Sequence, residues 1–460
     1  MTSKRPNILF IMADQFRTKS LTDLGDGIST PNIDRIRSKS MFFPNAACTA
    51  PLCTPSRASL ATGKMPSHCG VIHHDANLPK DQTTYYQLLR ESGYRVAVAG
   101  KTDLHKQDKT LGTAGPLPIA YHLGFTDPQY ETEGKMNCAW YGRGNNGEII
   151  PKGPYQRFLK ERYPQGLAEL QKRYIETLTK RPRYYAAATP LPDAFFLDNY
   201  IGTLAQDYLK TIDDETPWHL FVSFAGPHNP WDPPKSEVDK LVNKCYPQTL
   251  TDDGIGKPEW IRKRAKKQSA GMTEADLQNA KRHYDAAIQV IDKQIGAILD
   301  ILEQRGLAEN TIVIFTADHG ELMGDHGLFE KTAMYEGALR IPLLIHLPGM
   351  ETPTQSPALV SLMDLAPTLL ELAEADFPAR RIDALSLVPV LHDPNAPLRT
   401  VQMSELQNTH MLFDGRYKWI RNFNDTDELY DLQEDPNELN NIIAQHPDII
   451  KRLSAFTFRQ

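Results

Sequence analysis

The feature that most constrains the fold is a set of four short apolar runs, each followed closely by charged or amide side chains. The runs and the residues that follow them are 7–13 with Asp14 and Gln15, 94–99 with Lys101, 219–224 with His228, and 311–316 with Asp318 and His319. Short apolar runs that alternate with amphipathic helical segments indicate an α/β protein with a mainly parallel central sheet flanked by helices. Ligands bind beyond the carboxyl ends of the strands in such sheets, so we expect these side chains to meet at one edge.

Two segments between and after these runs have the pattern of helices. Thr273 is suited to cap a long helix that runs to about Gln304 and carries an apolar stripe along one face. A second helix is expected over residues 363–370, where Pro367 is tolerated only in the first turn. Both helices fit the flanking layers of an α/β protein.

The pattern changes to shorter elements from about Pro378 onward. Residues 411–420 predict a β-hairpin with Asp414-Gly415 as its two-residue turn, 427–432 predict another strand, and 436–450 predict a terminal helix. We therefore expect a catalytic α/β domain over residues 1–378 and a smaller C-terminal α+β subdomain, built on a short antiparallel sheet, over residues 379–460. The segment 106–200 is irregular and rich in aromatic residues, and it either shapes a substrate pocket or covers the core.

Charge and hydropathy exclude two classes of protein. The net charge of −6 argues against general nucleic-acid binding. No apolar run approaches the roughly 20 residues that a membrane-spanning helix needs. The first run is shorter than the core of a usual signal peptide and lacks a cleavage site of small residues, so it is interpreted as a strand. We expect a cytoplasmic protein, or a periplasmic or secreted one whose leader was removed.

The five cysteines are scattered and form no C-x-x-C pair, so neither a disulfide framework nor a structural zinc site is expected. Cys53 differs from the others because it begins the sequence Cys53-Thr54-Pro55-Ser56-Arg57. Pro55 suits the first turn of a short helix that Gly63 can end. A thiol at the positive end of a helix, with Arg57 one turn away, is expected to have a lowered pKa.

The side chains expected at the sheet edge suggest a reaction class. Two carboxylates, an amide oxygen and an imidazole suit a divalent cation, and the candidate ligands are Asp14, Gln15, Asp318 and His319. Three cations, Arg57, Lys101 and Lys331, can bind the oxygens of an anionic ester, and His228 can donate a proton to a leaving group. These groups indicate metal-assisted displacement at sulfur or phosphorus. A thiol is an unusual partner for a hard cation, so the residues alone leave the role of Cys53 open.

The sequence from Cys53 to Gly63 resembles the C-x-P-S-R signature of type I sulfatases in the alkaline phosphatase superfamily. The resemblance extends over nearly the whole chain. It includes PNILFIMADQ at 6–15, GK at 100–101, PH at 227–228, TADHG at 316–320, Lys331, YEGALRIP at 335–342, and LYDL at 429–432 followed by DP at 435–436.

The resemblance implies a role for each candidate residue. In that family the cysteine is converted to formylglycine, and an oxygen of its hydrate attacks sulfur to give a covalent sulfate ester. Modified Cys53 would then join Asp14, Gln15, Asp318 and His319 around one divalent metal, with calcium expected first and manganese as the alternative. Arg57 would steady the hydrate, Lys101 and Lys331 would hold sulfate oxygens, and His228 would protonate the departing alcohol. A formylglycine-generating or other sulfatase-maturating enzyme is the implied partner.

The chain departs from the common sulfatase pattern in two places. Gln15 and His319 stand where many sulfatases have Asp and Asn, and in this they resemble choline-sulfatase and phosphonate-monoester-hydrolase relatives. Asp103 occupies the place of a frequent His, and His105 follows two residues later. Either is a candidate for the base that resolves the intermediate, and His105 is favoured because an imidazole titrates near neutrality.

Three functional hypotheses follow. The leading one is a sulfatase acting on a sulfated small molecule or carbohydrate. The second keeps the fold and the nucleophile but cleaves phosphonate monoesters or phosphodiesters, and the third is a non-catalytic anion-binding protein with unmodified Cys53. The identity of the substrate and the oligomeric state are left open. The basic stretch 257–267 is interpreted as a solvated face, with attraction of polyanionic sugars as the alternative.

Overall fold

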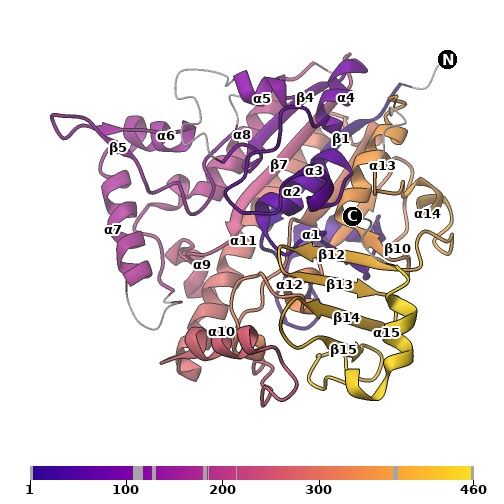
Figure 1. Cartoon of the computed structure of the whole chain (residues 1–460). Helices are drawn as coiled ribbons and strands as arrows, with labels where there is room; N and C mark the ends of the chain where they lie inside the picture. The colour runs from indigo at the N-terminus through magenta and orange to yellow at the C-terminus, as the bar shows by residue number, and fades with distance from the viewer. Residues whose placement is uncertain are drawn as a thin grey trace.

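The computed structural model describes residues 4–106, 118–126, 131–179, 184, 186–213, 215–376 and 382–456. Its centre is a seven-stranded sheet with the order β10-β2-β9-β8-β1-β7-β4 (Figure 1). The strands are β1 (Asn7–Asp14), β2 (Met41–Phe42), β4 (Arg95–Gly100), β7 (Trp218–Pro227), β8 (Thr311–Ala317), β9 (Leu343–His346) and β10 (Thr354–Gln355). Strands β4, β7, β1 and β8 are parallel neighbours, whereas β9 runs antiparallel to both β8 and β2. The predicted mainly parallel sheet is confirmed.

The four apolar runs of the sequence are the four adjacent parallel strands. Every residue of β1, β7 and β8 is buried, which explains why these strands are apolar at nearly every position instead of alternating. In the register of the sheet, Leu9 of β1 lies opposite Leu220 of β7 on one side and Val313 of β8 on the other. All four strands therefore end at the same edge.

Two groups of helices flank the sheet. Helices α1 (Pro31–Arg37), α8 (Leu197–Thr211) and α11 (Glu274–Gln304) pack together and contact the central strands, and a second group contains α2 (Cys53–Thr62), α4 (Tyr85–Glu91) and α13 (Leu365–Leu372). The predicted long helix is α11, and Thr273 caps it in a reciprocal pair of hydrogen bonds with Asp276. Pro367 lies in the first turn of α13, as expected. None of the helices in the described part of the chain is long and apolar enough to cross a bilayer.

The remaining helices and strands lie outside the central sheet and the two helix groups. A projecting arm between β4 and α8 contains β5 (Gly142–Arg143), β6 (Ile149–Ile150), α6 (Pro154–Arg162) and α7 (Gly166–Thr179), and it extends to the left in Figure 1. The others are α3 (Pro66–Cys69), α5 (Pro118–His122), α9 (Lys235–Lys240), α10 (Glu259–Ser269), α12 (Glu336–Leu339), α14 (Val388–His392), and the paired strands β3 (Ala46–Ala47) and β11 (Val360–Ser361).

The C-terminal part of the chain forms a separate four-stranded antiparallel sheet. Its strands are β12 (Gln402–Leu406), β13 (Thr409–Phe413), β14 (Tyr417–Asn422) and β15 (Glu428–Asp431), with α15 (Pro447–Leu453) beside them (Figure 1). A small apolar cluster of Leu412, Trp419, Leu429 and Leu453 joins α15 to this sheet. The predicted boundary between residues 378 and 379 lies outside the described residues.

Two local predictions in this subdomain are wrong. The hairpin is present, but its turn is Gly415-Arg416, because the backbone N–H of Asp414 donates to the carbonyl of Tyr417. The Asp414 carboxylate accepts from the N–H groups of Arg416 and Tyr417, and Gly415 takes a φ of 96°, so the turn begins one residue later than expected. The terminal helix is also shorter than predicted and begins only at Pro447.

Candidate active site

The four central strands deliver the candidate residues to one edge in spatial order. Moving from β8 through β1 and β7 to β4, the residues at or just beyond the strand ends are Asp318 with His319, Asp14 with Gln15, His228, and Lys101. Helix α2 brings Cys53 to the same edge because Cys53 is its first residue. The predicted convergence therefore brings together residues as distant in the chain as Gln15 and Asp318, which are 303 positions apart.

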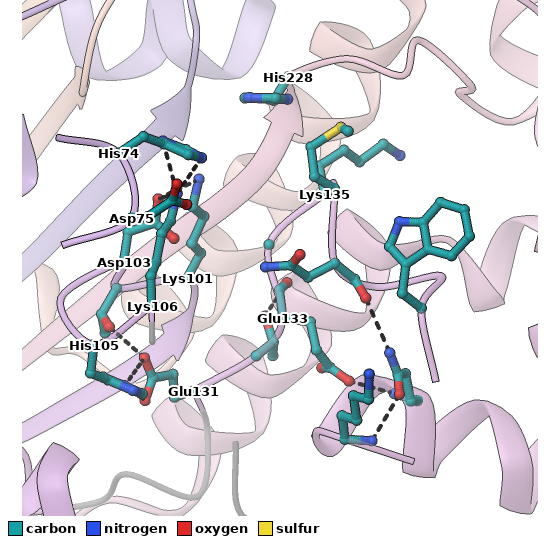
Figure 2. Close-up of a pocket in the computed structure, with 18 residues that line it drawn as sticks. His74, Asp75, Lys101, Asp103, His105, Lys106, Glu131, Glu133, Lys135 and His228 are labelled. Carbon is teal, nitrogen blue, oxygen red and sulfur yellow. Dashed lines mark hydrogen bonds and ion pairs between the residues drawn. The ribbon is translucent and has the colours of Figure 1, made fainter. Parts of the chain in front are cut away.

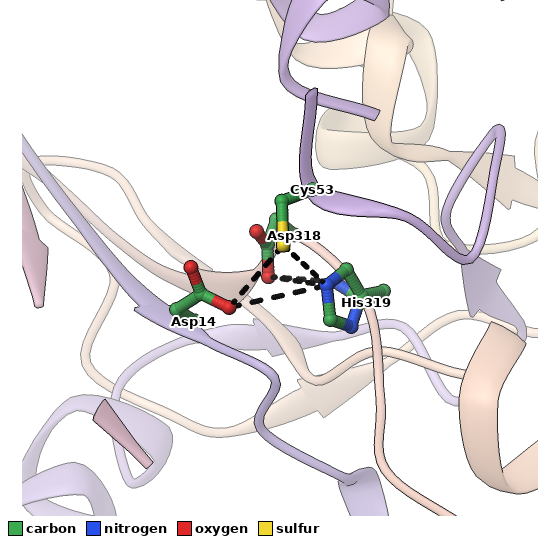
Figure 3. Close-up of side chains that lie close together, drawn as sticks. All are labelled: Asp14, Cys53, Asp318 and His319. Atoms are coloured by element: carbon green, nitrogen blue, oxygen red, sulfur yellow. Dashed lines mark hydrogen bonds and ion pairs between the residues drawn. The ribbon is translucent and has the colours of Figure 1, made fainter. Parts of the chain in front are cut away.

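Asp14, Cys53, Asp318 and His319 form a compact cluster of potential ligands (Figure 3). One ligand atom from each side chain can be chosen so that all four lie within 4.8 Å of one another, and all four residues are buried. The Cys53 Sγ atom lies 3.1 Å from Nε2 of His319 and 3.7 Å from Oδ1 of Asp14.

These side chains fit a divalent cation. The backbone carbonyl of Gly320 lies 2.9 Å from Nδ1 of His319 and accepts its hydrogen, so the lone pair of Nε2 points toward Cys53 and the carboxylates. Two carboxylates with one neutral imidazole are a donor set that suits calcium or manganese.

The residues after Cys53 attach α2 to the sheet edge. The hydroxyl of Ser56 donates to the carbonyl of Asp318 over 2.6 Å. The guanidinium of Arg57 donates to Oδ2 of Asp318 at 2.8 Å and to Oδ2 of Asp14 at 3.3 Å. A third bond from Arg57 reaches the hydroxyl of Ser223 at 2.8 Å. Arg57 therefore holds both acidic side chains in place, a function that the sequence reading did not assign to it.

The electrostatic field at the site favours ionised groups. Burial raises the pKa of Asp14, but the neighbouring cations, Lys101 first among them, outweigh this and hold that pKa well below its usual range. Burial and the charge of Asp14 raise the pKa of the Cys53 thiol, yet Lys101 and Lys331 lower it to a net value well below the ordinary one. The pKa of Cys53 is therefore shifted in the direction that the sequence predicted, but the main cause is the two lysines and not the helix start or Arg57.

Lys331 and Gln15 meet beside the cluster. The Lys331 Nζ atom donates to Oε1 of Gln15 at 2.6 Å and lies 2.6 Å from Nε2 of His228. The backbone N–H of Gln15 donates to Oδ1 of Asp318 at 3.0 Å. Gln15 is thus placed next to the candidate ligands, and its role as a ligand stays a prediction.

Two residues near Lys331 were not found by sequence reasoning. Glu321 is fully buried and accepts a hydrogen bond from the amide nitrogen of Gln15. Arg264 of α10 donates to the carbonyls of Phe329 and Lys331. The solvated-face interpretation of residues 257–267 therefore holds for exposed side chains such as Arg262 but is wrong for Arg264 and Lys257. Lys257 is buried and donates to the hydroxyl of Tyr430 and the carbonyl of Glu438. The signal for Glu321 was its place two residues after His319.

Asp103 and His105, the two candidate bases, have different surroundings. The Asp103 carboxylate lies 3.0 Å from Nζ of Lys101 and 2.8 Å from Nζ of Lys106. Burial raises the pKa of Asp103, but these two lysines outweigh it and leave that pKa far below its ordinary value. His105 instead lies 2.9 Å from both oxygens of Glu131 through Nε2. The choice of His105 as the base stays a prediction.

A cavity of about 410 Å³ opens beside these residues (Figure 2). Its wall includes Lys101, Asp103 and His228 from the strand edge, and residues 131–137 with Trp140 from the long segment between β4 and α8. In Figure 2, His228 lies at one end of the cavity, and His105 with Glu131 lies at the other. That segment was expected either to shape a pocket or to cover the core, and it shapes the pocket.

Comparison with known proteins gives a consistent result. Residues 6–375 match the family described as Sulfatase, and residues 324–455 match the family described as N-sulphoglucosamine sulphohydrolase, C-terminal. A choline-sulfatase from Rhizobium meliloti (strain 1021) is 28% identical over 474 aligned positions, which cover 97% of this chain and 84% of the relative.

Solved structures share the fold. One solved structure holds a protein in complex with its substrate D-glucosamine-2-N,6-O-disulfate. It aligns with a TM-score of 0.76 at 23% identity, and the alignment covers 98% of this chain and 96% of that chain. The phosphonate monoester hydrolase of Agrobacterium radiobacter has a TM-score of 0.77 at 22% identity, with 98% and 94% covered.

The strand-end residues, the C-x-P-S-R sequence at the start of α2 and the family match over residues 6–375 lead to the same conclusion. This chain belongs to the type I sulfatase family of sulfuric ester hydrolases, in the alkaline phosphatase superfamily.

Proposed function

We propose that this protein hydrolyses sulfate esters with an oxygen nucleophile made from Cys53, next to one divalent cation held by Asp14, Asp318 and His319. The observation that carries the proposal is the placement of the Cys53 Sγ atom within the cluster of potential ligands, 3.1 Å from the imidazole of His319. A hard divalent cation prefers oxygen ligands to a thiolate. A side chain that acts as a thiol is therefore not expected among these ligands, whereas an oxygen nucleophile is. Formylglycine at position 53 would supply, as its hydrate, the oxygen that attacks sulfur.

Lys101 and Lys331 suit the binding of the sulfate group. Both are almost fully buried. Lys101 contacts Asp14 of the cluster, and Lys331 contacts Gln15 and lies within electrostatic reach of Cys53 and Asp14. Buried ammonium groups act more strongly on an anionic ester than exposed ones because less water screens them. A cation at the carboxylate cluster would add Lewis-acid stabilisation of the same negative charge.

His228 suits proton transfer to the leaving alcohol. Its Nδ1 atom lies 2.5 Å from the carbonyl of Asn229 and donates to it, which leaves Nε2 to accept from the Lys331 ammonium at 2.6 Å. His228 also lines the cavity, so the imidazole that contacts Lys331 borders a space in which an alcohol group could lie. As an imidazolium, His228 would carry on Nε2 a proton that it can deliver to the departing oxygen.

Maturation must precede the final burial of α2. Cys53 and every other residue of α2 are buried, and the exposed fraction of Cys53 is 0%. A maturation enzyme, such as a formylglycine-generating enzyme, has to contact the residues around position 53 to modify it. We therefore propose that the maturing enzyme acts on the unfolded or partly folded chain.

The test is parallel turnover of an aryl sulfate and an aryl phosphonate monoester by the purified protein. We expect faster turnover of the sulfate and a peptide mass at position 53 that is about 18 Da below that of the thiol. The Cys53→Ala variant should lose turnover. Cys138→Ala, which removes a buried thiol outside the cluster, should retain it. Preference for the phosphonate would establish the alternative hydrolase, and an unmodified Cys53 with no turnover would leave an anion-binding protein.

Similar proteins suggest which compounds to test for the alcohol part of the substrate. One is a choline-sulfatase, and one structure holds a sulfated glucosamine, so choline sulfate and sulfated amino sugars are the first compounds to compare. A cavity of about 410 Å³ with Trp140, lysines and carboxylates in its wall has room for either class. The comparison of kcat/KM for these compounds decides between them.

A further inference from the structure

Glu321 contacts two parts of the active site at once. It is fully buried, and its two oxygens accept three hydrogen bonds. Oε2 accepts from the side-chain nitrogen of Gln15, and Oε1 accepts from the backbone N–H of Met323 at 2.8 Å and of Glu330 at 2.6 Å. Gln15 directly follows β1, and Glu330 directly precedes Lys331 in the chain.

These bonds close a ring through the site. From Glu321 the ring runs to the amide nitrogen of Gln15, and from the amide oxygen of Gln15 to Nζ of Lys331. It returns along the backbone from Lys331 to the N–H of Glu330, which donates to Glu321. Each of its groups has only one way to bond. A carboxylate accepts only and an ammonium donates only, so the amide of Gln15 must point its nitrogen at Glu321 and its oxygen at Lys331.

The backbone on both sides of the ring is strained. Gln15, Glu330 and Thr332 have φ values of 67°, 66° and 73°, the left-handed region that residues other than glycine rarely occupy. Such conformations cost on the order of 1–3 kcal/mol each and persist only where the surroundings impose them. Glu321 is one of those surroundings, because it bonds the N–H of Glu330 and the side chain of Gln15.

We propose that Glu321 is a positioning residue that turns the amide oxygen of Gln15 toward Lys331, beside the cation cluster, and fixes the backbone next to Lys331. The inference rests on the proposed function in one respect, since it takes the cluster beside Gln15 to be the cation site. It concerns a residue outside that cluster, which contacts the side chain of Gln15 and the backbone N–H of Glu330 next to Lys331.

Replacing Glu321 by Gln tests this directly. The carboxamide keeps the size of the side chain and one oxygen for the two backbone N–H groups, but it turns an NH₂ group toward the NH₂ of Gln15. Two donors cannot bond, so the Gln15 amide either loses its bond at position 321 or rotates and turns its nitrogen toward the Lys331 ammonium. In neither case does position 321 still hold the amide oxygen of Gln15 on Lys331. We expect Glu321→Gln to weaken calcium or manganese binding about 10- to 100-fold, the usual effect of losing an outer partner of a metal site.

The experiment measures ion affinity by isothermal titration of chelator-treated protein with calcium and, separately, with manganese. The double variant Gln15→Glu with Glu321→Gln restores a donor–acceptor pair with the direction of the bond reversed, and it should regain most of the lost affinity. Glu330→Gln controls for charge, because Glu330 also lies within electrostatic reach of Lys331 but does not touch Gln15. It should lose much less affinity than Glu321→Gln does.

Glu428→Gln controls for stability. Glu428 is 1% exposed, lies in the C-terminal sheet and also accepts three hydrogen bonds, from the hydroxyls of Tyr335 and Tyr430 and from the amide of Asn422. A merely structural Glu321 would lower Tm as Glu428→Gln does and leave ion affinity unchanged, which would overturn the proposal. A double variant that binds as weakly as Glu321→Gln would also overturn it.

Crystal structures of the wild type and of Glu321→Gln keep this result separate from the proposed function. If the wild type binds neither ion, the cation site of the proposed function fails, and the structures still decide about Glu321. Separation of the Gln15 amide from Nζ of Lys331 beyond hydrogen-bonding distance would support the positioning role. An unchanged contact between Oε1 of Gln15 and Nζ of Lys331 would refute it.

Discussion

The Nε2 atom of His319 lies 3.1 Å from the Sγ atom of Cys53, although 266 positions separate the two residues in the chain. The contact joins the first residue of α2 to the segment that follows β8, across the edge of the central sheet. It also places the residue that would carry the nucleophile among candidate metal ligands. Four predictions follow from this arrangement and the contacts around it.

His319→Ala should abolish stabilisation by calcium or manganese. A bound ion stabilises the folded chain by RT ln(1 + [L]/Kd), which is about 2.7 kcal/mol at an ion concentration of 100 Kd. Loss of one of the candidate ligands raises Kd and removes this gain. The measurement is Tm with and without added ion after chelator treatment. His326→Ala, which removes an imidazole bonded to Asp252 outside the cluster, should keep the response to the ion. An equal ion-dependent rise in Tm for His319→Ala would contradict the assignment.

Arg264→Ala should lower kcat/KM for an aryl sulfate by roughly 100-fold, the loss expected when a catalytic group moves by about 1 Å. The Arg264 guanidinium donates to the carbonyls of Phe329 and Lys331 and to the hydroxyl of Thr332, and so holds Lys331 in a strained stretch of backbone. Arg262→Ala removes an exposed cation from the same helix and is the matched control. Equal kinetics for the two variants would show that Arg264 does not position Lys331.

Gly100→Ala should disrupt the end of β4 and the placement of Lys101. Gly100 has a φ of 113°, and an added Cβ would lie 2.0 Å from the carbonyl oxygen of Ser223, which the backbone of β7 holds in place. We expect a loss of about 3 kcal/mol or more in the free energy of unfolding. Gly147→Ala has a similar positive φ of 81° but open space, and it should cost only about 1 kcal/mol. Denaturant titration compares the two, and a similar small cost for both would refute the steric explanation.

Glu133 should make the protein less stable as pH rises from about 4.5 to about 7. Burial raises the pKa of Glu133 to about 7 in the folded protein, although it accepts from the backbone N–H groups of Tyr155 and Gln156. Within this window the folded state holds a proton that the unfolded state has released, so the free energy of unfolding falls with rising pH, by up to about 3 kcal/mol.

Glu133→Gln should remove this part of the pH dependence. Burial also raises the pKa of Asp285 to about 7, which gives a slope of the same sign, so the measured quantity is the difference between wild type and variant. Denaturant titrations at pH 4.5, 6 and 7 would determine it. Parallel curves for the two proteins would mean that Glu133 does not titrate in this range.

Much of the fold was predictable because buried strands and buried helix faces give recognisable patterns of apolar residues in the sequence. Strands covered on both faces are apolar at nearly every position, so β1, β4, β7 and β8 could be read directly, and the stripe on α11 gave the long helix. The hairpin turn was misplaced by one residue, because Asp414 bonds two N–H groups and shifts the turn to Gly415. Such local competition between side chain and backbone is not visible in hydropathy.

The sequence by itself determined which chemical groups the site contains. Polar residues after apolar runs identified Asp14, Lys101, His228 and Asp318, and the residues after Cys53 identified the family resemblance. What only the tertiary structure decided is how these groups are held. The hydrogen bond from Gln15 to Glu321 joins residues 306 positions apart, and the bond from Arg264 to the carbonyl of Lys331 joins residues 67 positions apart. Both bonds involve loops that contain residues with positive φ. No periodic pattern encodes such contacts, since they depend on the path of each loop after the sheet has formed.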